Sequence, residues 1–421
     1  MKKSKSCIVS FLLFALLSFS QSIIAQQYHY PTYKGLVMAG YQGWFNTAED
    51  GAGRGWHHFE RRGKFAPGSL EIDLWPDMTE YKKQYATPFT FADGKTATVF
   101  SAYDKSTVDL HFKWMKQYGI DGVFMQRFVA EIRNASGKKH FNTVLQNAMQ
   151  AAKHTGRAIC IMYDLSGMKP EEAGIVLSDI DELNAQYGLL DKEAKKSPTY
   201  LHENGKPLVT VWGVGFNDNR RYGFTEAKKI IDGLNARGYS VMLGVPTYWR
   251  NLGSDALKSD SLHALIKKCA IVAPWFVGRY DEQSYPQFHK NIEEDIVWCK
   301  QNNVEYVPLA FPGFSWRNMN GPNARTIDRD NGNFFWQQVA GAKAANAQML
   351  YIAMFDEMNE GTSIFKCATE SGLPLNPNGS FVQIPDSLGT DYYLWLAGQA
   401  ANWFHGKAGY SAEKPQRNIS K

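Results

Sequence analysis

The stretch Met-Leu-Tyr-Ile-Ala-Met-Phe at residues 349–355 runs directly into Asp-Glu-Met-Asn-Glu-Gly-Thr at residues 356–362. The first part is a short and continuous apolar run, which is typical of a strand buried on both faces of a parallel sheet. The second part places three acidic residues within five positions, immediately before a glycine. The pair of segments therefore predicts a buried strand that delivers carboxyl groups at its C-terminal end.

Seven earlier runs have the same apolar character, at residues 36–41, 122–126, 158–163, 208–212, 240–245, 270–275 and 306–311. Segments with apolar residues at helical spacing lie between them, at residues 107–118, 141–154, 225–237, 261–268, 293–302 and 333–345. Strand alternating with helix eight times, with no break in composition, predicts an α/β fold that is a single (β/α)₈ TIM barrel. A doubly wound open sheet is the alternative. Its nucleotide-binding form is disfavoured, because no G-x-G-x-x-G or G-x-x-x-x-G-K follows the first strand.

The composition of the chain is that of an ordinary globular protein. Of its 421 residues, 44% are hydrophobic and 21% are charged, which excludes a disordered or collagen-like chain. A basic head followed by an apolar run predicts a secretory signal peptide at residues 1–25, with an uncleaved anchor as the alternative. We therefore expect a catalytic domain at residues 26–408 and a loose polar tail at residues 409–421.

Charge and cysteine content limit the partners that the mature chain can have. Without residues 1–25 the chain keeps 43 basic and 41 acidic residues, so its charge favours no nucleic acid or other strongly charged partner. Its four remaining cysteines show no zinc-site spacing and are too few for a disulfide framework, although one disulfide is possible after export.

Two segments are longer than connections need to be, at residues 42–105 and 361–390. In a barrel both would emerge at the C-terminal face, where TIM-barrel enzymes keep their active sites. Glu357 and Glu360 stand at that face after the eighth strand. Side chains three apart on a helical turn lie about 5–6 Å apart, which is close to the spacing of the two carboxyl groups in retaining glycosidases. Repulsion between two close carboxylates also makes their pKa values differ, so that one group can act as an acid and the other as a base.

Aromatic and polar residues recur at the other predicted strand ends. Aromatic rings with polar edges suit a sugar, which has apolar C–H faces and a hydroxyl rim. The alternative for any single Trp is a place in the core at the top of the barrel. The candidate substrate-binding residues are Tyr41, Trp44, His57, His58, Gln126, Arg127, Tyr163, Asp164, Trp212, Tyr248, Trp249, Trp275, Trp316 and Asn359.

We expect no metal and no cofactor. His57 and His58 are adjacent, so in an extended segment they point in opposite directions, and no third ligand is near. Residues 328–332 resemble a calcium loop only faintly and are expected to cap a helix. The sequence contains no G-x-S-x-G motif, which would indicate a serine nucleophile.

These residues resemble glycoside hydrolase family 99 and the related family 71. The resemblance is strongest at residues 41–44, at residues 107–124 and at residues 355–362. The family motif Phe-Asn-Glu-Trp-His-Glu-Gly-Thr is matched at five positions and differs at Asp356, Met358 and Asn359. The resemblance implies a (β/α)₈ barrel that cleaves internal α-mannosidic bonds with retention.

The resemblance also implies roles for the two glutamates. Glu357 matches the residue that takes the proton from the sugar 2-hydroxyl, whose oxygen then attacks C1 to give a 1,2-anhydro sugar. Glu360 matches the residue that protonates the leaving oxygen and then activates water. Met358 and Asn359 replace residues that line the sugar site in the family, so a xylosidase or arabinosidase activity is an alternative to mannoside cleavage.

Two other hypotheses stay open from the sequence. One is a non-catalytic barrel that binds glycans, and the other is an inverting glycosidase in which Asp164 is the distant partner of Glu360. We expect an oligosaccharide or polysaccharide as the partner, no nucleic acid, no integral membrane segment after removal of the signal peptide, and a monomer. Export would place the protein in the periplasm, at the cell surface or outside the cell.

Overall fold

The computed structural model describes residues 28–377 and 379–417. The predicted signal peptide lies outside the described residues. The central sheet consists of parallel strands that are almost entirely buried, as their continuous apolar sequences require. In chain order they are β1 (Val37–Tyr41), β4 (Gly122–Phe128), β5 (Ala158–Asp164), β7 (Lys206–Trp212), β8 (Ser240–Val245), β9 (Ile271–Pro274), β10 (Glu305–Tyr306), β11 (Leu309–Ala310) and β14 (Leu350–Ile352).

The sheet closes on itself through residues 305–310. β10 pairs with β9 and β11 pairs with β14, which in turn pairs with β1. β10 and β11 are two halves of one seventh strand, divided at Pro308, which has no N–H to donate to a ladder. Across the division the Val307 N–H donates to the Val272 carbonyl at 3.1 Å, and the Pro308 carbonyl accepts from the Tyr351 N–H at 3.0 Å. The predicted TIM-barrel fold is therefore confirmed.

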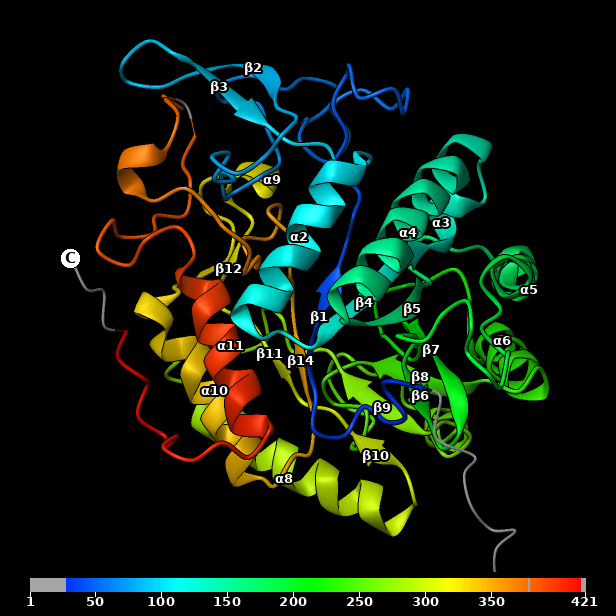
Figure 1. Ribbon diagram of the computed structural model, residues 1–421. Helices are drawn as coiled ribbons and strands as arrows, with labels where there is room; N and C mark the ends of the chain where they lie inside the picture. Colours follow the sequence, from blue (N-terminus) through cyan, green and yellow to red (C-terminus); the bar gives the residue numbers. More distant parts are fainter. Residues whose placement is uncertain (1–27, 378, 418–421) are drawn as a thin grey trace, which may run out of the picture.

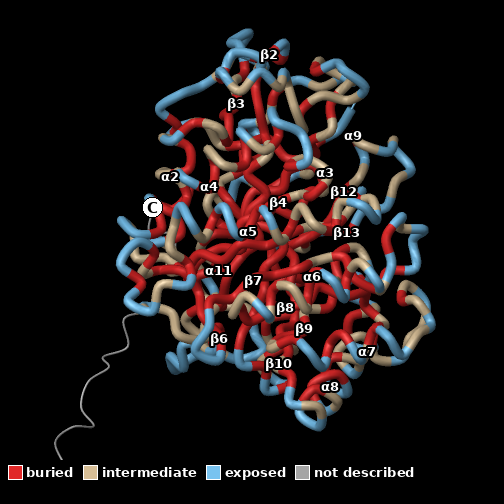
Figure 2. The backbone as a smooth tube through the Cα atoms, turned by 90° about the vertical axis from the view of Figure 1, so that its right-hand side faces the viewer, coloured by how far each residue is buried: buried red, intermediate tan, exposed pale blue. Residues whose placement is uncertain are grey.

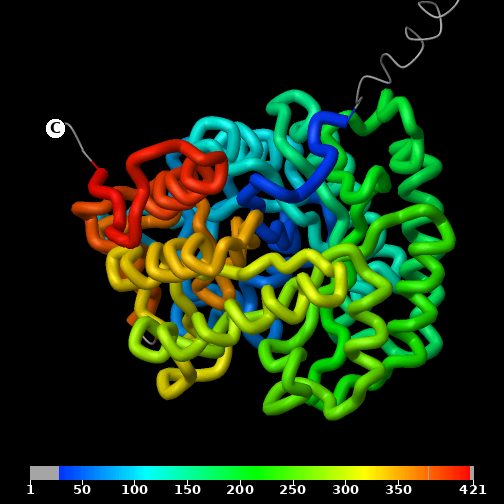
Figure 3. Tube along the Cα trace, turned by 90° about the horizontal axis from the view of Figure 1, so that it is seen from below, coloured from blue at the N-terminus to red at the C-terminus, as the bar shows by residue number. Residues whose placement is uncertain are grey.

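Helices surround the sheet, as the view from below shows (Figure 3). Each of the eight strand positions is followed by a helix. These helices are α2 (Lys105–Tyr118), α4 (Ala135–Thr155), α5 (Ala173–Tyr187), α6 (Phe224–Ala236), α7 (Ser261–Ile266), α8 (Tyr285–Gln301), α10 (Asn333–Ala344) and α11 (Tyr392–Phe404). Shorter helical pieces are α3 (Val129–Ile132), α9 (Arg317–Asn320), η1 (Pro170–Glu172), η2 (Asp330–Gly332) and η3 (Glu370–Gly372).

Two of these helices, α5 and α11, were not predicted from helical spacing. α11 is apolar on most of its surface, so no single stripe marks it in the sequence. Its burial has a structural cause, since α11 packs against α10 and α2. The approach to α2 is close: a Cβ at Gly398 would lie 1.9 Å from the carbonyl oxygen of Tyr118.

The two long segments predicted after the first and eighth strands cover one end of the barrel (Figure 1). The first contains the hairpin of β2 (Tyr85–Thr90) and β3 (Thr96–Val99). The connection after the seventh strand adds the hairpin of β12 (Phe314–Ser315) and β13 (Thr326–Ile327). A further short strand, β6 (His202–Glu203), pairs with β7. Burial is concentrated in the strands and on the inner sides of the helices, with exposed chain at the periphery (Figure 2).

The expected polar tail is held against the barrel as far as Arg417. Tyr410 stacks on Trp403 with ring centroids 6.2 Å apart, and the Arg417 guanidinium forms two 2.7 Å hydrogen bonds with Asp391. Cys160, Cys269, Cys299 and Cys367 are buried free thiols, and no disulfide joins them. Among the helices of the described residues, none has the length and apolar content that crossing a bilayer requires.

Candidate active site

The acidic motif begins three residues after the end of β14 and forms a tight turn. Residues 358–361 form a turn and not an α-helix. The prediction that one turn of helix separates Glu357 from Glu360 is therefore wrong. The Glu357 carbonyl accepts hydrogen bonds from the Thr362 and Ser363 N–H groups at 3.2 and 3.0 Å. Gly361 has a φ of +62°, which a glycine adopts without strain. The turn still brings both glutamates to one cavity.

This cavity, which we name the acidic cavity, has a volume of about 220 Å³ at the C-terminal end of the barrel. The register of the strands places Phe128, Asp164 and Trp212 at one level of the wall, because Phe128 is paired with Asp164 and Asp164 with Trp212. Gly244 leaves room for the Trp212 indole, since a Cβ there would lie 2.4 Å from its ring. The lining residues are Gln42, Trp44, Gln126, Phe128, Met162, Asp164, Ser166, Trp212, Trp275, Glu357 and Glu360.

Burial dominates the electrostatics of the three carboxyl groups in the acidic cavity. Burial raises the pKa of Glu357 well above its usual range, and the neighbouring charge of Glu360 raises it further. Burial also raises the pKa of Glu360 to about 7, although the polar edge of the Trp316 indole opposes that shift. The pKa of Asp164 is raised by burial as well. A raised pKa keeps a carboxyl group protonated closer to neutral pH, which a general acid requires.

Seven of the residues singled out in the sequence meet in the acidic cavity. They are Trp44, Gln126, Asp164, Trp212, Trp275, Glu357 and Glu360. Three carboxyl groups thereby share the cavity, so Asp164 can pair with either glutamate and the two glutamates can pair with each other. Aromatic walls around a few convergent polar groups are the usual make-up of a small-molecule site.

Three other candidates point away from the acidic cavity, into the layer between strands and helices. The Tyr41 hydroxyl lies 2.9 Å from His111 Nδ1 on α2. Arg127 is fully buried and donates through Nε at 2.8 Å to Asp179 on α5, which also accepts from the Tyr163 hydroxyl at 2.7 Å. The prediction that Tyr41, Arg127 and Tyr163 contact the substrate is therefore wrong. Side chains alternate between the two faces of a strand, and these three lie on the face that is turned away from the acidic cavity.

Trp249 is also a core residue and not a substrate contact. Its indole N–H donates to Asp295 at 3.1 Å, and its ring packs on Trp298 with centroids 4.9 Å apart. Tyr248 is half-buried with its ring 6.1 Å from that of Phe288 on α8, outside the residues that line the acidic cavity. Trp316, by contrast, lowers the pKa of Glu360, although it is not one of the residues that line the acidic cavity.

The two histidines and Asn359 support the cavity wall from behind. The His58 ring stacks on Trp44 with centroids 3.8 Å apart and planes at 11°, and Asn359 donates to the His58 carbonyl at 2.8 Å. Burial holds the pKa of His58 well below its usual range, so this ring is neutral. His57 Nε2 lies 3.7 Å from a carboxylate oxygen of Glu131. None of the three lines the acidic cavity.

Four lining residues were missed in the sequence: Gln42, Phe128, Met162 and Ser166. Each is one or two positions from a residue that had been singled out. A consistent count of inward and outward positions along each strand would have found Gln42, Phe128 and Met162. Asp356 has a further role, because its carboxylate accepts the Gln42 and Gly43 N–H groups at 2.7 and 2.9 Å and so fixes the start of the first loop.

Parts of the chain are similar in sequence to known proteins. A family model described as a domain of unknown function (DUF5010) matches residues 196–374. The glycoprotein endo-alpha-1,2-mannosidase of Mus musculus is 28% identical over 148 residues, which is 30% of this chain and 32% of the mouse protein. A similar protein of Danio rerio is 27% identical over 149 residues. The match thus spans about a third of the length of these relatives.

The chain is similar to the endo-α-mannosidases of glycoside hydrolase family 99, as its motif indicates. The family 99 endo-alpha-mannosidase of Bacteroides thetaiotaomicron superposes with a TM-score of 0.64 at 16% identity, over 90% of this chain and 100% of that one. This likeness to family 99 establishes a shared fold. Within residues 28–377 and 379–417, no group of three or more His, Cys, Asp or Glu is placed to hold a metal ion.

Proposed function

We propose that this protein is an exported glycoside hydrolase that cleaves α-linked glycans, with α-mannosides as the first substrates to test. The observation that carries the proposal is the acidic cavity, in which Glu357 and Glu360 lie together and share a wall with four aromatic rings. The similarity to family 99 enzymes supports the same activity. A xylosidase or arabinosidase specificity is the alternative within this class, because Met358 and Asn359 depart from the family motif.

In the proposed mechanism Glu357 takes the proton of the sugar 2-hydroxyl while Glu360 protonates the leaving oxygen. The first step breaks the glycosidic bond and forms the C1–O2 bond of a 1,2-anhydro sugar. Glu360 then takes a proton from water, whose oxygen attacks C1 and breaks the C1–O2 bond, while Glu357 returns its proton to O2.

Replacing each glutamate by glutamine tests the assignment. We expect Glu357→Gln and Glu360→Gln each to lower kcat/KM about 10²–10⁴-fold, the usual contribution of a general acid or base. Initial rates on a panel of α-mannosides, α-xylosides and α-arabinosides measure the effect. Glu370→Gln, an exposed acid in the same long loop, is the matched control and should leave the rate unchanged. Full activity in both cavity variants would refute the proposed roles.

The stereochemistry of the product separates the proposed mechanism from an inverting one. Proton NMR of the first product formed should show the anomeric configuration of the substrate. Asp164 lies in the same cavity, so it is positioned to act as the base of an inverting reaction with Glu360 as acid. Initial formation of the opposite anomer, lost in Asp164→Asn, would establish that second mechanism instead. Affinity for glycans with no turnover would identify a binding protein.

A further inference from the structure

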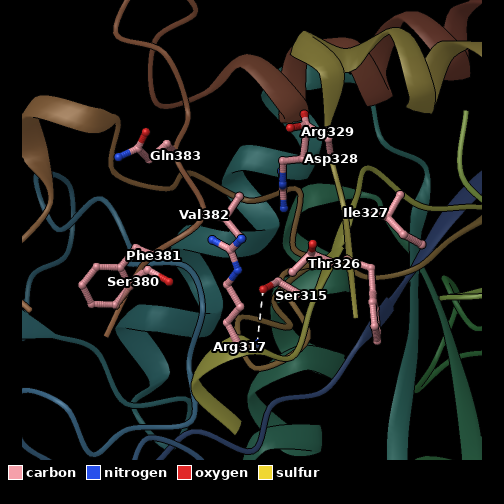
Figure 4. A pocket seen from close by; sticks show the side chains of 11 residues that line it. Ser315, Arg317, Thr326, Ile327, Asp328, Arg329, Ser380, Phe381, Val382 and Gln383 are labelled. Atoms are coloured by element: carbon pink, nitrogen blue, oxygen red, sulfur yellow. Dashed lines mark hydrogen bonds between the residues drawn. The ribbon is translucent and has the colours of Figure 1, made fainter. Parts of the chain in front are cut away.

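A second cavity lies beside the acidic cavity, between the β12–β13 hairpin and residues 380–383 (Figure 4). Its volume is about 370 Å³, within the range of sites for small molecules. Its walls come from the loops after the seventh and eighth strands, where TIM barrels frequently hold phosphate groups. The two cavities share a backbone contact, because the Ser315 N–H donates to the Glu360 carbonyl at 2.8 Å.

Arg329 is the most unusual residue in this second cavity. It is only 4% exposed, and its Nη2 donates at 2.8 Å to the carbonyls of Gly361 and Ser363. Its Nε and Nη1 have no hydrogen-bond partner among the described residues. The guanidinium lies 4.4 Å from the centre of the Tyr393 ring and pairs with no described carboxylate. A buried cation without an acidic partner is costly, so its retention here indicates an anionic ligand.

Arg317 contributes a second cation to the same cavity. Its side chain is exposed, and Figure 4 shows its guanidinium pointing toward Val382. The N–H groups of Arg317 and Asn318 are already occupied, since both donate to the Asp73 carboxylate, at 2.8 and 2.9 Å. An anion would therefore be bound by the side chains. Asp328 is the one acid of the lining, and its carboxylate accepts the Asp330 N–H at 2.6 Å.

We propose that this second cavity binds the carboxylate or sulfate group of an acidic sugar unit, in a glycan whose neighbouring bond reaches Glu357 and Glu360. The fork of an arginine matches a planar oxyanion and can bind it through two parallel hydrogen bonds. The exposed hydroxyls of Thr326 and Ser380 in the lining suit sugar hydroxyls. That such a glycan is a substrate rests on the proposed hydrolase function. Binding of the acidic sugar unit to the second cavity does not depend on that function.

Isothermal titration of the full chain with three methyl glycosides tests the site: methyl glucuronoside, methyl glucoside and methyl glucoside 6-sulfate. We expect at least one of the two acidic glycosides to bind about tenfold more tightly than the neutral one, as one charge-assisted hydrogen bond allows. Arg317→Ala should remove this preference. Arg325→Ala is the matched control, because Arg325 is an exposed cation of the same hairpin that does not line the cavity.

Two further variants and a titration with inorganic sulfate separate the possible outcomes. The double variant Glu357→Gln/Glu360→Gln should keep the preference for acidic sugars, so a failure of the hydrolase proposal is separable from a failure of this site. Arg329→Met should also lose the preference, with circular dichroism to check folding, since Arg329 holds two carbonyls. Equal affinity for neutral and acidic glycosides, or equal effects of Arg317→Ala and Arg325→Ala, would overturn the proposal. Inorganic sulfate binding as tightly as the sulfated glycoside would refute recognition of a sugar.

Discussion

Glu360 shares the acidic cavity with two further carboxyl groups, and its burial has a measurable consequence for stability. Its pKa is raised from 4.5 to about 7 in the folded protein. Between those pH values the folded state binds more protons than the unfolded state, so the free energy of unfolding falls as pH rises. This destabilisation is complete above about pH 7 and absent below about pH 4.5.

Glu360→Gln should remove its share of this pH dependence. We expect the free energy of unfolding of the variant to fall less than that of the native chain between pH 5 and pH 7.5. Urea titrations at several pH values, followed by tryptophan fluorescence, measure the difference. Glu370→Gln is again the control and should reproduce the native slope. A slope in Glu360→Gln equal to the native one would contradict the burial that we describe for this carboxyl group.

At the scale of elements, the pair of Arg127 and Asp179 connects β4 to α5. Arg127 is 1% exposed, Asp179 is 2% exposed, and the Tyr163 hydroxyl of β5 and the Asn142 amide oxygen of α4 complete the cluster. Removing one partner of such a pair leaves a buried charge uncompensated. The cluster therefore stabilises the side of the barrel that carries Gln126 and Asp164.

Arg127→Met should lower the free energy of unfolding by about 3–5 kcal/mol, as expected for a broken buried ion pair. Arg133→Met is the matched control, because Arg133 forms a more exposed pair with Glu172 at 3.0 Å. That pair should contribute about 1 kcal/mol or less. Chemical denaturation of both variants measures the contrast. Similar losses in the two variants would contradict a structural role for Arg127 and favour the prediction that it contacts the substrate.

The strands were predictable because their apolar runs are continuous, but that same continuity hides which side chains point inward. Tyr41, Arg127 and Tyr163 were singled out together with Gln126 and Asp164, but only Gln126 and Asp164, with the missed Gln42, line the acidic cavity. Glu357 and Glu360 were found because they follow the last strand, where the chain has left the ladder. Arg329 could not be found in this way, because its burial depends on contacts with Gly361, Ser363 and Tyr393 from distant segments.

On the scale of the whole molecule, α11 completes the ring of helices around the barrel by packing against α2. Gly398 of α11 lies against the Tyr118 carbonyl of α2, with no space for a side chain. Gly398→Leu should therefore force the two helices apart and lower the free energy of unfolding by about 1–3 kcal/mol, the usual cost of overpacking. Differential scanning calorimetry measures the loss.

Gly406→Leu is no suitable control, since Gly406 has a positive φ. Gly174→Leu is suitable, because Gly174 has an ordinary helical place in α5 and no atom lies within 4 Å of a Cβ built there. We expect this control to leave the melting temperature nearly unchanged. An equally small effect of Gly398→Leu would show that the two helices do not hold the barrel closed.

The ring also determines the order in which the chain can complete its fold. The Tyr33 hydroxyl donates to the Leu350 carbonyl, 317 positions further along the chain, and β1 has β14 as one of its two neighbours. Contacts between such distant parts of a sequence slow folding. A nascent polypeptide therefore leaves one edge of β1 without a partner until residues 350–352 have been synthesised, and a product that stops before residue 350 has no means of closing its barrel.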